Sequence, residues 1–558
     1  MKQIVLIQPW IEDFYTTSCR IQPIGLAYLA SSITQQFPNL EVIVIDCLAG
    51  GRKRSIPWPK EFSYLKAYYG YPDNGPFSLF YQYYRFGQSE KEIRNTLRKH
   101  SPDLIGISSL FSPYYRQSLA MAEICKELFP MVPVVMGGNH ASMHPHTLLF
   151  AQASGSKIPG KMRPYLCDFV LRGEAEESFC GLIKCLMEKK SLSEESNLVN
   201  RDFYKSQDEK GRNEENEKLP ALVSPSRNDI PIPDFSGLML HDYEYDNRPM
   251  SFLITTRSCR FRCSFCSVHA VFGKQFWARP VKHILEEIKG RFEEGVRHFD
   301  IEDDDFAGDK EFCSRLLEEI YALKLPITFS AMNGLNYRSL DEELLRLLKR
   351  AGFEMLNLSL VSVKKEIRQM TGRPGASDDD FFNVVQLATG MGFRVIAYTI
   401  LGMPGQTIKD MWDSLRCLAS ASCLIGASPF YFTPGSPIHC RLKNDENIKL
   451  ASLGKDVFFS ARLTTMDVET DAFSREDIYT LFRLSRLLNY LKEGVDKGLQ
   501  TDDVYFRPAI EALHKGEWFA ESSGGKNALP FSNKVHEATG RRPLEVSGYR
   551  TQQKQIFY

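Results

Sequence analysis

The sequence predicts an α/β protein in which two runs of alternating strands and helices follow one another. In the first run, amphipathic helical segments separate short apolar strands at residues 3–8, 41–46, 104–108, 132–136 and 169–171. After residue 250 the alternation resumes, with further strands at 251–255, 298–301, 327–331, 355–360, 395–400 and 424–432. Strands that alternate with helices in this way indicate parallel sheets covered by helices.

The chain divides into four parts by pattern. We expect a doubly wound, Rossmann-like domain at 1–190, a polar linker at 191–249, a second α/β domain at 250–440, and a mainly helical region with a polar tail at 441–558. A chain of 558 residues is long enough for two or three hydrophobic cores. Parallel sheets bind ligands at the carboxyl ends of their strands, so we expect sites at those edges.

Composition excludes several classes of partner. The net charge is zero and no basic stripe is present, so a nucleic-acid partner is not expected. No apolar run approaches the roughly 18–20 residues of a membrane helix. The apolar start at 1–7 is soon interrupted by Pro9 and is too short for a secretory segment. We therefore expect a cytoplasmic protein that does not bind a membrane.

Three of the 13 cysteines stand close together, as Cys259, Cys263 and Cys266 in a C-x3-C-x2-C pattern. In a cytoplasmic protein the other ten are expected to be reduced, and most of them to be small buried residues. Thiolates are the ligands of iron–sulfur clusters, and three of them leave the fourth iron of a four-iron cube open for a substrate or cofactor. Structural zinc needs four ligands, and His269 is the only nearby candidate for a fourth. The pattern predicts a 4Fe–4S cluster.

The surroundings of these cysteines resemble the radical S-adenosylmethionine (radical SAM) superfamily. An apolar strand at 252–254 leads into the cysteine loop, a helix at 280–295 follows it, and Phe265 precedes the last cysteine as the family's aromatic residue does. The resemblance implies a partial (β/α)6 barrel at 250–440, with the cluster on the three cysteines and S-adenosylmethionine at its open iron. Phe265 would lie near the adenine. An electron from a reductase or flavodoxin-type donor would split the cosubstrate into methionine and a 5′-deoxyadenosyl radical, which removes a hydrogen atom from an unactivated carbon.

Two further segments resemble family motifs of the cosubstrate site. Residues 303–306 match D-D-x-F, whose carboxylates Asp303 and Asp304 would contact the methionine amino group; a metal site or a solvated acidic turn is the alternative. Residues 402–407 resemble G-x-P-G-E-T, so Gly402, Pro404 and Gly405 would lie near the cosubstrate, although Gln406 replaces the usual Glu. Residues 359–362 lack the carboxylate of the family's G-I-E-S, which leaves the ribose contact there in doubt.

The N-terminal half resembles cobalamin-binding domains. Ser108 and Leu110 form an S-x-L after the third strand, and Gly137 and Gly138 form a glycine pair after the fourth; in that family these two loops cradle the cofactor. Other stretches also resemble the cobalamin domain of class B radical SAM enzymes, namely 23–30, 102–108, 137–140 and 172–176.

One departure from the methionine-synthase type of cobalamin domain concerns the lower face of cobalt. Its D-x-H-x-x-G is replaced here by residues 8–13, which contain no histidine. If cobalamin binds, we expect its tail to be displaced and no histidine of this domain to coordinate the lower face. His140, His144 and His146 lie near the glycine pair, and surface or core roles are at least as good an interpretation of them as ligation.

An insert at 51–100 is rich in aromatic residues and has few basic ones. A platform for single-stranded nucleic acid interleaves the two kinds, so we interpret the insert as a packed lid over the cofactor.

Taken together, the resemblances imply a cobalamin-dependent radical methyltransferase that acts on a small-molecule or peptide substrate. A radical cyclase, rearrangement or oxidation enzyme without methyl transfer is the second hypothesis. The third is a non-catalytic cobalamin or cluster sensor, which would need an effector domain; residues 441–558 show no helix pair of the DNA-reading kind. The sequence assigns no catalytic side chain.

Overall fold

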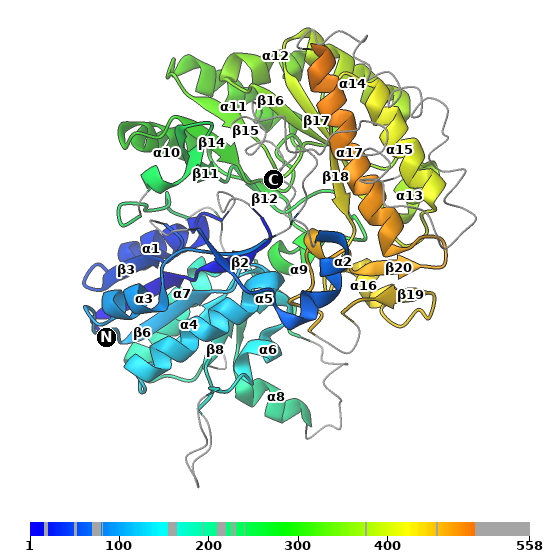
Figure 1. The fold of residues 1–558 in the computed structure, drawn as a ribbon. Coiled ribbons are helices and arrows are strands. Elements are labelled where there is room, and N and C mark those ends of the chain that lie inside the picture. Colours follow the sequence, from blue (N-terminus) through cyan, green and yellow to red (C-terminus); the bar gives the residue numbers. More distant parts are fainter. Residues whose placement is uncertain are drawn as a thin grey trace.

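The protein folds into two α/β halves that lie against one another, coloured blue to cyan and green to yellow in Figure 1. The structure is a computed structural model. It describes residues 1–15, 21–49, 53–69, 80, 82–154, 164–192, 195–208, 219–224, 227, 230–238, 240–373, 377–452 and 456–496.

The N-terminal sheet has the strand order β3-β1-β6-β7-β8-β9. Its first five strands are parallel: β1 (Gln3–Gln8), β3 (Glu41–Asp46), β6 (Leu104–Ser108), β7 (Val134–Gly137) and β8 (Phe169–Leu171). Because side chains alternate along a strand, Ile4 and Leu6 of β1 face α1 (Ile24–Gln36) and α7 (Glu176–Glu188). Val5 and Ile7 face α3 (Glu90–Leu97) and α4 (Tyr115–Leu128). Both faces are covered, as the apolar strands predict.

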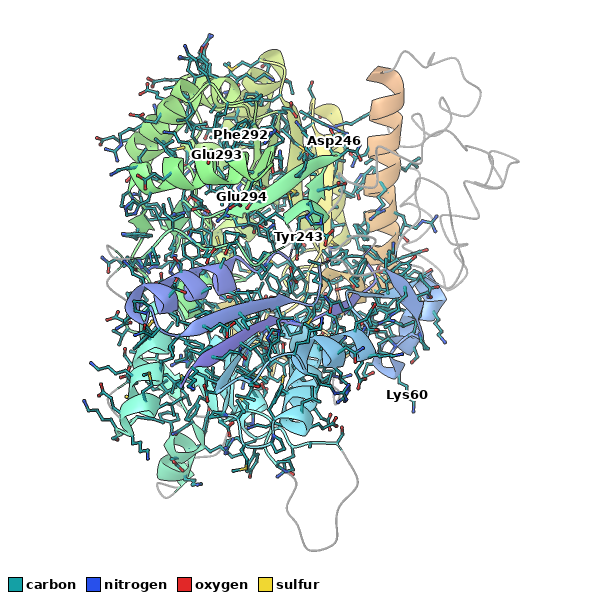
Figure 2. The ribbon with its side chains drawn as sticks, turned by 90° about the vertical axis from the view of Figure 1, so that its left-hand side faces the viewer. Lys60, Tyr243, Asp246, Phe292, Glu293 and Glu294 are labelled. Atoms are coloured by element: carbon teal, nitrogen blue, oxygen red, sulfur yellow. The ribbon has the colours of Figure 1, made fainter. Side chains whose placement is uncertain are left out.

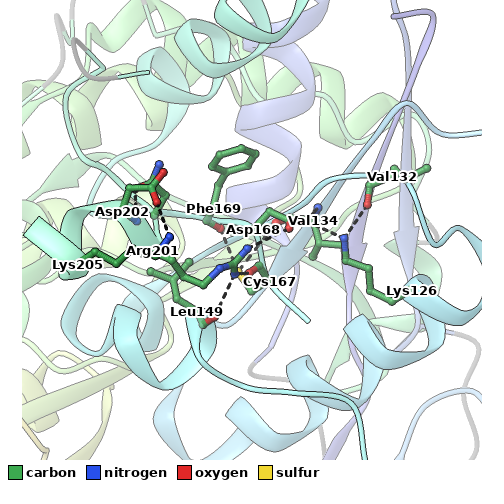
Figure 3. Close-up of polar contacts among 11 residues, drawn as sticks. Lys126, Val132, Val134, Leu149, Cys167, Asp168, Phe169, Arg201, Asp202 and Lys205 are labelled. Atoms are coloured by element: carbon green, nitrogen blue, oxygen red, sulfur yellow. Dashed lines mark hydrogen bonds and ion pairs between the residues drawn. The ribbon is translucent and has the colours of Figure 1, made fainter. Parts of the chain in front are cut away.

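The predicted linker contains ordered elements that the sequence analysis did not anticipate. β9 (Leu198–Val199) adds an antiparallel edge strand to the N-terminal sheet, and α8 (Arg201–Asp208) follows it. Asp168 fixes this helix to the sheet: its carboxylate accepts hydrogen bonds from Lys126 Nζ at 2.7 Å and Val134 N at 2.9 Å, and lies 3.5 Å from Arg201 (Figure 3). These contacts are polar and long-range, so no apolar periodicity revealed them.

The second half is a partial barrel of six parallel strands. Three of them pair in sequence: β11 (Arg248–Leu253), β14 (His298–Ile301) and β15 (Thr328–Ser330). The other three form a second ladder: β16 (Met355–Val361), β17 (Arg394–Leu401) and β18 (Leu424–Pro429). Isolated parallel bridges from Phe329 to Phe353 and from Leu335 to Leu358 join the two ladders. Helices cover the outer face: α10 (Val281–Glu293), α11 (Lys310–Ala322), α12 (Glu342–Ala351), α14 (Asp378–Gly390) and α15 (Ile408–Ser420).

The described part of the C-terminal region closes the barrel edge. α17 (Arg475–Asp496) runs along β18, where the Asn489 side chain exchanges two hydrogen bonds with the backbone of Ile425, at 2.7 and 2.8 Å (Figure 1). The edge strand therefore finds polar partners on a helix. A hairpin of β19 (Ile448–Leu450) and β20 (Val468–Thr470) precedes α17, so the region is not helical throughout. The predicted polar tail, from 497 on, lies outside the described residues.

The aromatic insert packs against this C-terminal region. A small sheet of β2 (Ile11–Asp13), β5 (Tyr83–Phe86) and β4 (Arg54–Ile56) carries a short 3-10 helix (Lys60–Leu65) and α2 (Lys66–Tyr69). Phe62 is fully buried and stacks on Phe459, with ring centroids 4.8 Å apart. The buried guanidinium of Arg462 lies 3.0 Å from the carboxylate of Asp13. The insert thus connects the two halves through the C-terminal region.

The carboxyl edges of the two sheets face one another. Phe252 N, on β11, donates to Gln22 Oε1 at 2.7 Å, and Tyr243 donates to the Asp46 carboxylate at 2.6 Å. Figure 2 shows Tyr243 at the level where the two halves meet. None of the described helices is long and apolar enough to cross a membrane.

We predict that Phe62→Ala destabilises the protein strongly. Removing a buried ring from a packed site costs roughly 3–5 kcal/mol, because both transfer energy and cavity formation contribute. Urea unfolding followed by tryptophan fluorescence measures the change. Phe111, which is 40% exposed, provides the control: Phe111→Ala should stay within about 0.5 kcal/mol of wild type. Equal effects of the two substitutions would contradict the prediction.

Candidate functional site

The cysteine loop leaves the carboxyl end of β11 and is closed by main-chain pairing. β12 (Thr256–Arg257) pairs antiparallel with β13 (Trp277–Ala278), so both ends of the loop are held together. Within it, His269 has one ring nitrogen 2.7 Å from Phe261 O and the other 3.0 Å from Gly273 O. His269 therefore braces the loop, and its ring nitrogens are occupied by carbonyl oxygens. This disfavours the zinc interpretation, which needs His269 as the fourth ligand.

The three cysteines are shielded from solvent to different degrees. Cys263 is buried and Cys259 and Cys266 are half-buried. Among the described residues, no three His, Cys, Asp or Glu side chains converge as ligands of one ion. A four-iron cube binds each of its thiolates at a different iron.

Main-chain and side-chain donors already point at the sulfur atoms. Arg373 Nε donates to Cys263 Sγ at 3.3 Å, and Phe261 N donates to Cys259 Sγ at 3.4 Å. Burial raises the pKa of the Cys259 thiol to about 12 and that of Cys266 to about 11. A bound metal deprotonates such thiols, and the donors then stabilise the thiolates. The residues present fit an iron–sulfur cluster.

The two predicted aspartates after β14 differ in their surroundings. Asp303 is buried and accepts hydrogen bonds from Thr255 N at 2.6 Å, from the Thr255 hydroxyl and from the Thr256 hydroxyl at 2.8 Å. These bonds fix the start of the cysteine loop. Asp304 is half-buried and has no hydrogen-bond or salt-bridge partner among the described residues. Burial, followed by the charges of Asp303 and Asp305, raises the pKa of Asp304 to about 7. Asp304 is the carboxylate available to a ligand.

The glycine turn after β17 is tight, and the side chain of Gln406 completes it. Gly402 and Gly405 have φ of +83° and +94°, a region in which glycine is favoured. Gln406 is buried; its Oε1 accepts from Met403 N at 2.8 Å and its Nε2 donates to Ile400 O at 3.1 Å. Because this side chain both accepts and donates, an amide suits the position where relatives carry Glu. Pro404, inside the turn, is also buried.

The segment without the family carboxylate contains a β-bulge. The register of β16 shifts between Ser359 and Val361, and Val361 has a φ of +71°, which is costly for a β-branched residue. Arg373 reaches back to this bulge and donates to Ser359 O at 3.2 Å. Arg373 therefore connects the bulge to Cys263. The sequence analysis did not single out Arg373, because only the tertiary fold brings it beside a cysteine.

The two loops of the predicted cobalamin cradle lie in contact. Ser109 N donates to Gly137 O at 2.7 Å, and a Cβ added to Gly138 would meet Ser109 O at 2.6 Å. Ser108 pairs with Gly137 at the ends of β6 and β7, and Leu110 follows directly. The hydroxyl of Ser109 is buried without a hydrogen-bond partner in the described structure, so it is available to a polar ligand. A glycine backbone beside a hydroxyl without a partner fits the tail of cobalamin. The role of Ser109 could not be predicted from the sequence, because it depends on the burial of the Ser109 hydroxyl in the folded chain.

The three histidines near this cradle have protein contacts. His140 is fully buried, with one ring nitrogen 3.0 Å from Ser112 Oγ and the other 2.9 Å from Thr147 Oγ1. His144 Nε2 lies 3.0 Å from Pro434 O, a barrel residue. Burial lowers the pKa of His144 to about 4, so its ring is neutral. His146 packs among aromatic rings. His140 is a core histidine with both nitrogens occupied, which favours the structural interpretation.

A buried ion network joins the cradle half to the cysteine loop. Arg257, two residues before Cys259, lies 2.7 Å from Glu174 Oε1 and 2.6 Å from Glu176 Oε1. Arg227 binds the other oxygen of Glu174 at 2.5 Å. Except for Glu176, whose side chain is 11% exposed, these side chains are 5% exposed or less. Glu174 and Glu176 belong to the 172–176 stretch that the sequence analysis noted without a role.

Comparison with known proteins agrees with both halves. The radical SAM superfamily profile matches residues 253–418, and the B12-binding domain profile matches residues 81–183. The chain therefore contains a radical SAM domain and a B12-binding domain. It is 26% identical over 396 residues to an uncharacterised methyltransferase of Pyrococcus horikoshii, which covers 71% of this chain and 72% of the relative.

Two further similarities extend along most of this enzyme. The cytidylyl-2-hydroxyethylphosphonate methyltransferase of Streptomyces wedmorensis is 24% identical over 452 residues, covering 75% of this chain and 76% of the relative. The solved structure of the radical S-adenosylmethionine methyltransferase TsrM from Kitasatospora setae superposes with a TM-score of 0.57 at 16% identity, covering 79% of this chain and 76% of that one. At this identity the superposition shows the shared fold.

We predict that Glu174→Gln destabilises the enzyme by roughly 3 kcal/mol, because two buried guanidinium groups then lose their shared counter-charge. Differential scanning fluorimetry and urea unfolding measure the loss. Glu286, whose side chain is 46% exposed and pairs with Lys282 at 3.7 Å, is the matched control. Glu286→Gln should change stability by less than about 0.5 kcal/mol. A Glu174→Gln variant as stable as wild type would show that the network does not hold the loop.

Proposed function

We propose that this enzyme is a cobalamin-dependent radical methyltransferase that methylates an unactivated carbon of a small-molecule or peptide substrate. The observation that carries the proposal is the placement of the cysteine loop opposite the Ser109–Gly138 cradle. Both lie at carboxyl edges of parallel sheets, and these edges meet through Glu174–Arg257 and His144–Pro434. A methyl carrier and a radical source are useful together only when both reach one substrate.

The residues take the following roles in the proposal. The cluster is held by Cys259, Cys263 and Cys266. The Asp304 carboxylate accepts a hydrogen bond from the amino group of S-adenosylmethionine, and the Phe265 ring lies along the adenine of this cosubstrate. When bound, the reduced 4Fe–4S cluster supplies the electron that splits S-adenosylmethionine into methionine and a 5′-deoxyadenosyl radical, and cobalamin supplies the methyl group. Arg373 and the Phe261 amide stabilise charge on the thiolates, while Asp303 keeps the loop in place.

The interior of the barrel supports a polar substrate. Asn357, on β16, donates to the Tyr398 hydroxyl of β17 at 2.6 Å, and its own Oδ1 is buried without a hydrogen-bond partner in the described structure. Asp300 of β14 likewise has a buried Oδ2 without a hydrogen-bond partner there. Buried acceptors of this kind favour a ligand that brings hydrogen-bond donors. The aromatic insert, which lies between β2 and the C-terminal region, would cover the site as a lid.

We predict that Cys263→Ala abolishes cluster assembly and with it the formation of 5′-deoxyadenosine and methylated product. The test is anaerobic reconstitution with iron, sulfide and hydroxocobalamin, followed by absorption and electron paramagnetic resonance spectra and by mass analysis of products. Wild type should show a 4Fe–4S signal that S-adenosylmethionine perturbs, a base-off cobalt(II) spectrum, and a product heavier by one methyl group.

The exposed Cys440 provides the control for that experiment, since Cys440→Ala removes a thiol outside the loop and should leave both spectra unchanged. A wild-type protein without a cluster would refute the proposed function. A cluster and 5′-deoxyadenosine without any mass gain would instead support radical chemistry without methyl transfer.

We predict that S-adenosylmethionine affinity falls as the pH drops below about 7. Asp304 has a raised pKa near 7, so acidification protonates it and removes the charge that attracts the ammonium group. Anaerobic titration calorimetry between about pH 8 and pH 6 measures this dependence. Asp304→Asn should bind about tenfold more weakly at the higher pH and lose the pH dependence. Asp471→Asn, at an exposed pair with Lys449, should behave as wild type; a pH profile unchanged in Asp304→Asn would contradict the assignment.

A further inference from the structure

The barrel strand β14 presents two polar side chains to the interior of the barrel. Side chains alternate along a strand, and Phe299 and Ile301 pack in the core beneath the helices. His298 and Asp300 therefore face the opposite way, into the interior. Asp300 is fully buried there.

A hydrogen-bonded network joins these two residues to β15. His298 Nδ1 lies 2.8 Å from Thr328 Oγ1, and His298 Nε2 lies 2.9 Å from Ser330 Oγ. Ser330 donates to Asp300 Oδ1 at 2.7 Å, and Met332 N donates to the same oxygen at 3.1 Å. Burial lowers the pKa of His298 to about 3, so the ring is neutral and brings no positive charge to Asp300.

The network continues to β16 and β17 through Met332. Met332 O accepts from the Tyr398 hydroxyl at 3.0 Å, and that hydroxyl accepts from Asn357 Nδ2 at 2.6 Å. Room for the Tyr398 ring depends on Gly426 of β18, because a Cβ added there would overlap the ring. Four strands thus contribute to one polar network inside the barrel.

The interior is closed at one end but remains accessible to solvent. Tyr245, on β10 (Glu244–Tyr245), stacks on the His298 ring with centroids 4.1 Å apart, and it packs with Leu424 of β18. These contacts close the interior on its amino-terminal side. Tyr398, which faces the interior, is still partly exposed, so solvent reaches the space above this closed end.

Two oxygen atoms of the network have no hydrogen-bond partner in the described part of the chain. They are Asp300 Oδ2 and Asn357 Oδ1, and the two residues are 0% and 2% exposed. The Asp300 carboxylate also forms no salt bridge with any residue that the structure describes. Burying a charge and two acceptors without partners is unfavourable, and a ligand with N–H groups removes this penalty.

A protonated amino group meets both needs of this site. It brings three N–H donors and a positive charge, whereas a hydroxyl group brings one donor and no charge. Hydrogen bonds between charged partners are also stronger than neutral ones. Asp300 precedes Asp304 by four residues, which span about 14 Å at most, so a small molecule bound at Asp300 extends toward the edge where Asp304 lies.

We propose that Asp300 and Asn357 select a substrate that carries a protonated amino group, with Asp300 as its counter-charge and Asn357 Oδ1 as a second acceptor. The proposal rests on the proposed function, because it names the class of substrate that the enzyme methylates. The amino group is held deep in the barrel, so a different part of the substrate, nearer the carboxyl edge, carries the reacting carbon. Recognition forms no covalent bond and transfers no proton.

The test compares pentylamine, which is protonated at neutral pH, with pentanol, its uncharged counterpart of equal chain length. Anaerobic calorimetry measures the binding of each probe to the reconstituted enzyme, with S-adenosylmethionine present and no reductant, so that nothing turns over. Wild type should bind the amine about tenfold more tightly than the alcohol. Asp300→Asn keeps an acceptor for Ser330 and Met332 but removes the charge, so the two probes should then bind within about twofold of one another.

Two further variants complete the comparison. Asn357→Leu removes the second acceptor and should weaken binding of the amine about threefold. Asp202→Asn removes an exposed carboxylate on α8, where Asp202 pairs with Lys205 at 2.9 Å, and should keep the wild-type preference for the amine.

Melting temperatures without a probe separate a ligand site from a structural carboxylate. Asp300→Asn should melt at or above the wild-type temperature, because it removes a buried charge that has no ionic partner in the described chain. A melting temperature clearly below that of wild type would show that the carboxylate stabilises the fold, and the proposal would be overturned.

The proposal is also overturned if wild type shows no preference for the amine, or if Asp300→Asn retains that preference. A loss of S-adenosylmethionine affinity in Asp300→Asn, with the amine unaffected, would overturn it as well, since the acceptors would then serve the cosubstrate. Failure of the proposed function appears separately, as a wild type without cluster or methylated product. The probe affinities still decide in that case whether the barrel interior binds an amine.

Discussion

The buried bridge between Glu174, Glu176 and Arg257 is the interaction on which the arrangement of this enzyme depends. It joins the end of β8 in one sheet to the residue that precedes the cysteine loop in the other. Ions buried this deeply are stable only while they remain paired, because an unpaired charge has lost its hydration. The network therefore favours one relative placement of the two halves. That placement puts the cradle at β6 and β7 opposite the cysteines.

The charged groups around the cysteine loop have different roles. Asp303 is used to hold the backbone of the loop, whereas its neighbour Asp304 remains without a partner in the described structure. Arg373 and main-chain amides supply positive potential at the sulfur atoms. These donors would stabilise the negative charge of the Cys263 and Cys259 thiolates when the cluster is bound.

Much of this architecture could be predicted from local patterns. The parallel strands of the two sheets were placed to within three residues at each end, because apolar runs separated by amphipathic helices are distinctive in a parallel sheet. The S-x-L and glycine-pair loops were expected to act together, and they share hydrogen bonds. Among the elements that were not anticipated, β9 and α8 lie in a polar stretch where Asp168 lies 3.5 Å from Arg201. Polar contacts across long sequence distances leave no periodic signal.

The sequence by itself determined the chemistry that the enzyme can hold: three closely spaced cysteines, two adjacent aspartates and a glycine pair after a strand. Those features are local, since each depends on residues within one loop. Only the tertiary structure decided which aspartate is available, that Gln406 completes its turn, that His140 is a core residue, and that Arg373 reaches Cys263. Burial and hydrogen-bond partners decide these roles, and both arise from elements far apart in the chain. The type of each side chain is known from the sequence, but its neighbours in space are determined only by the folded structure.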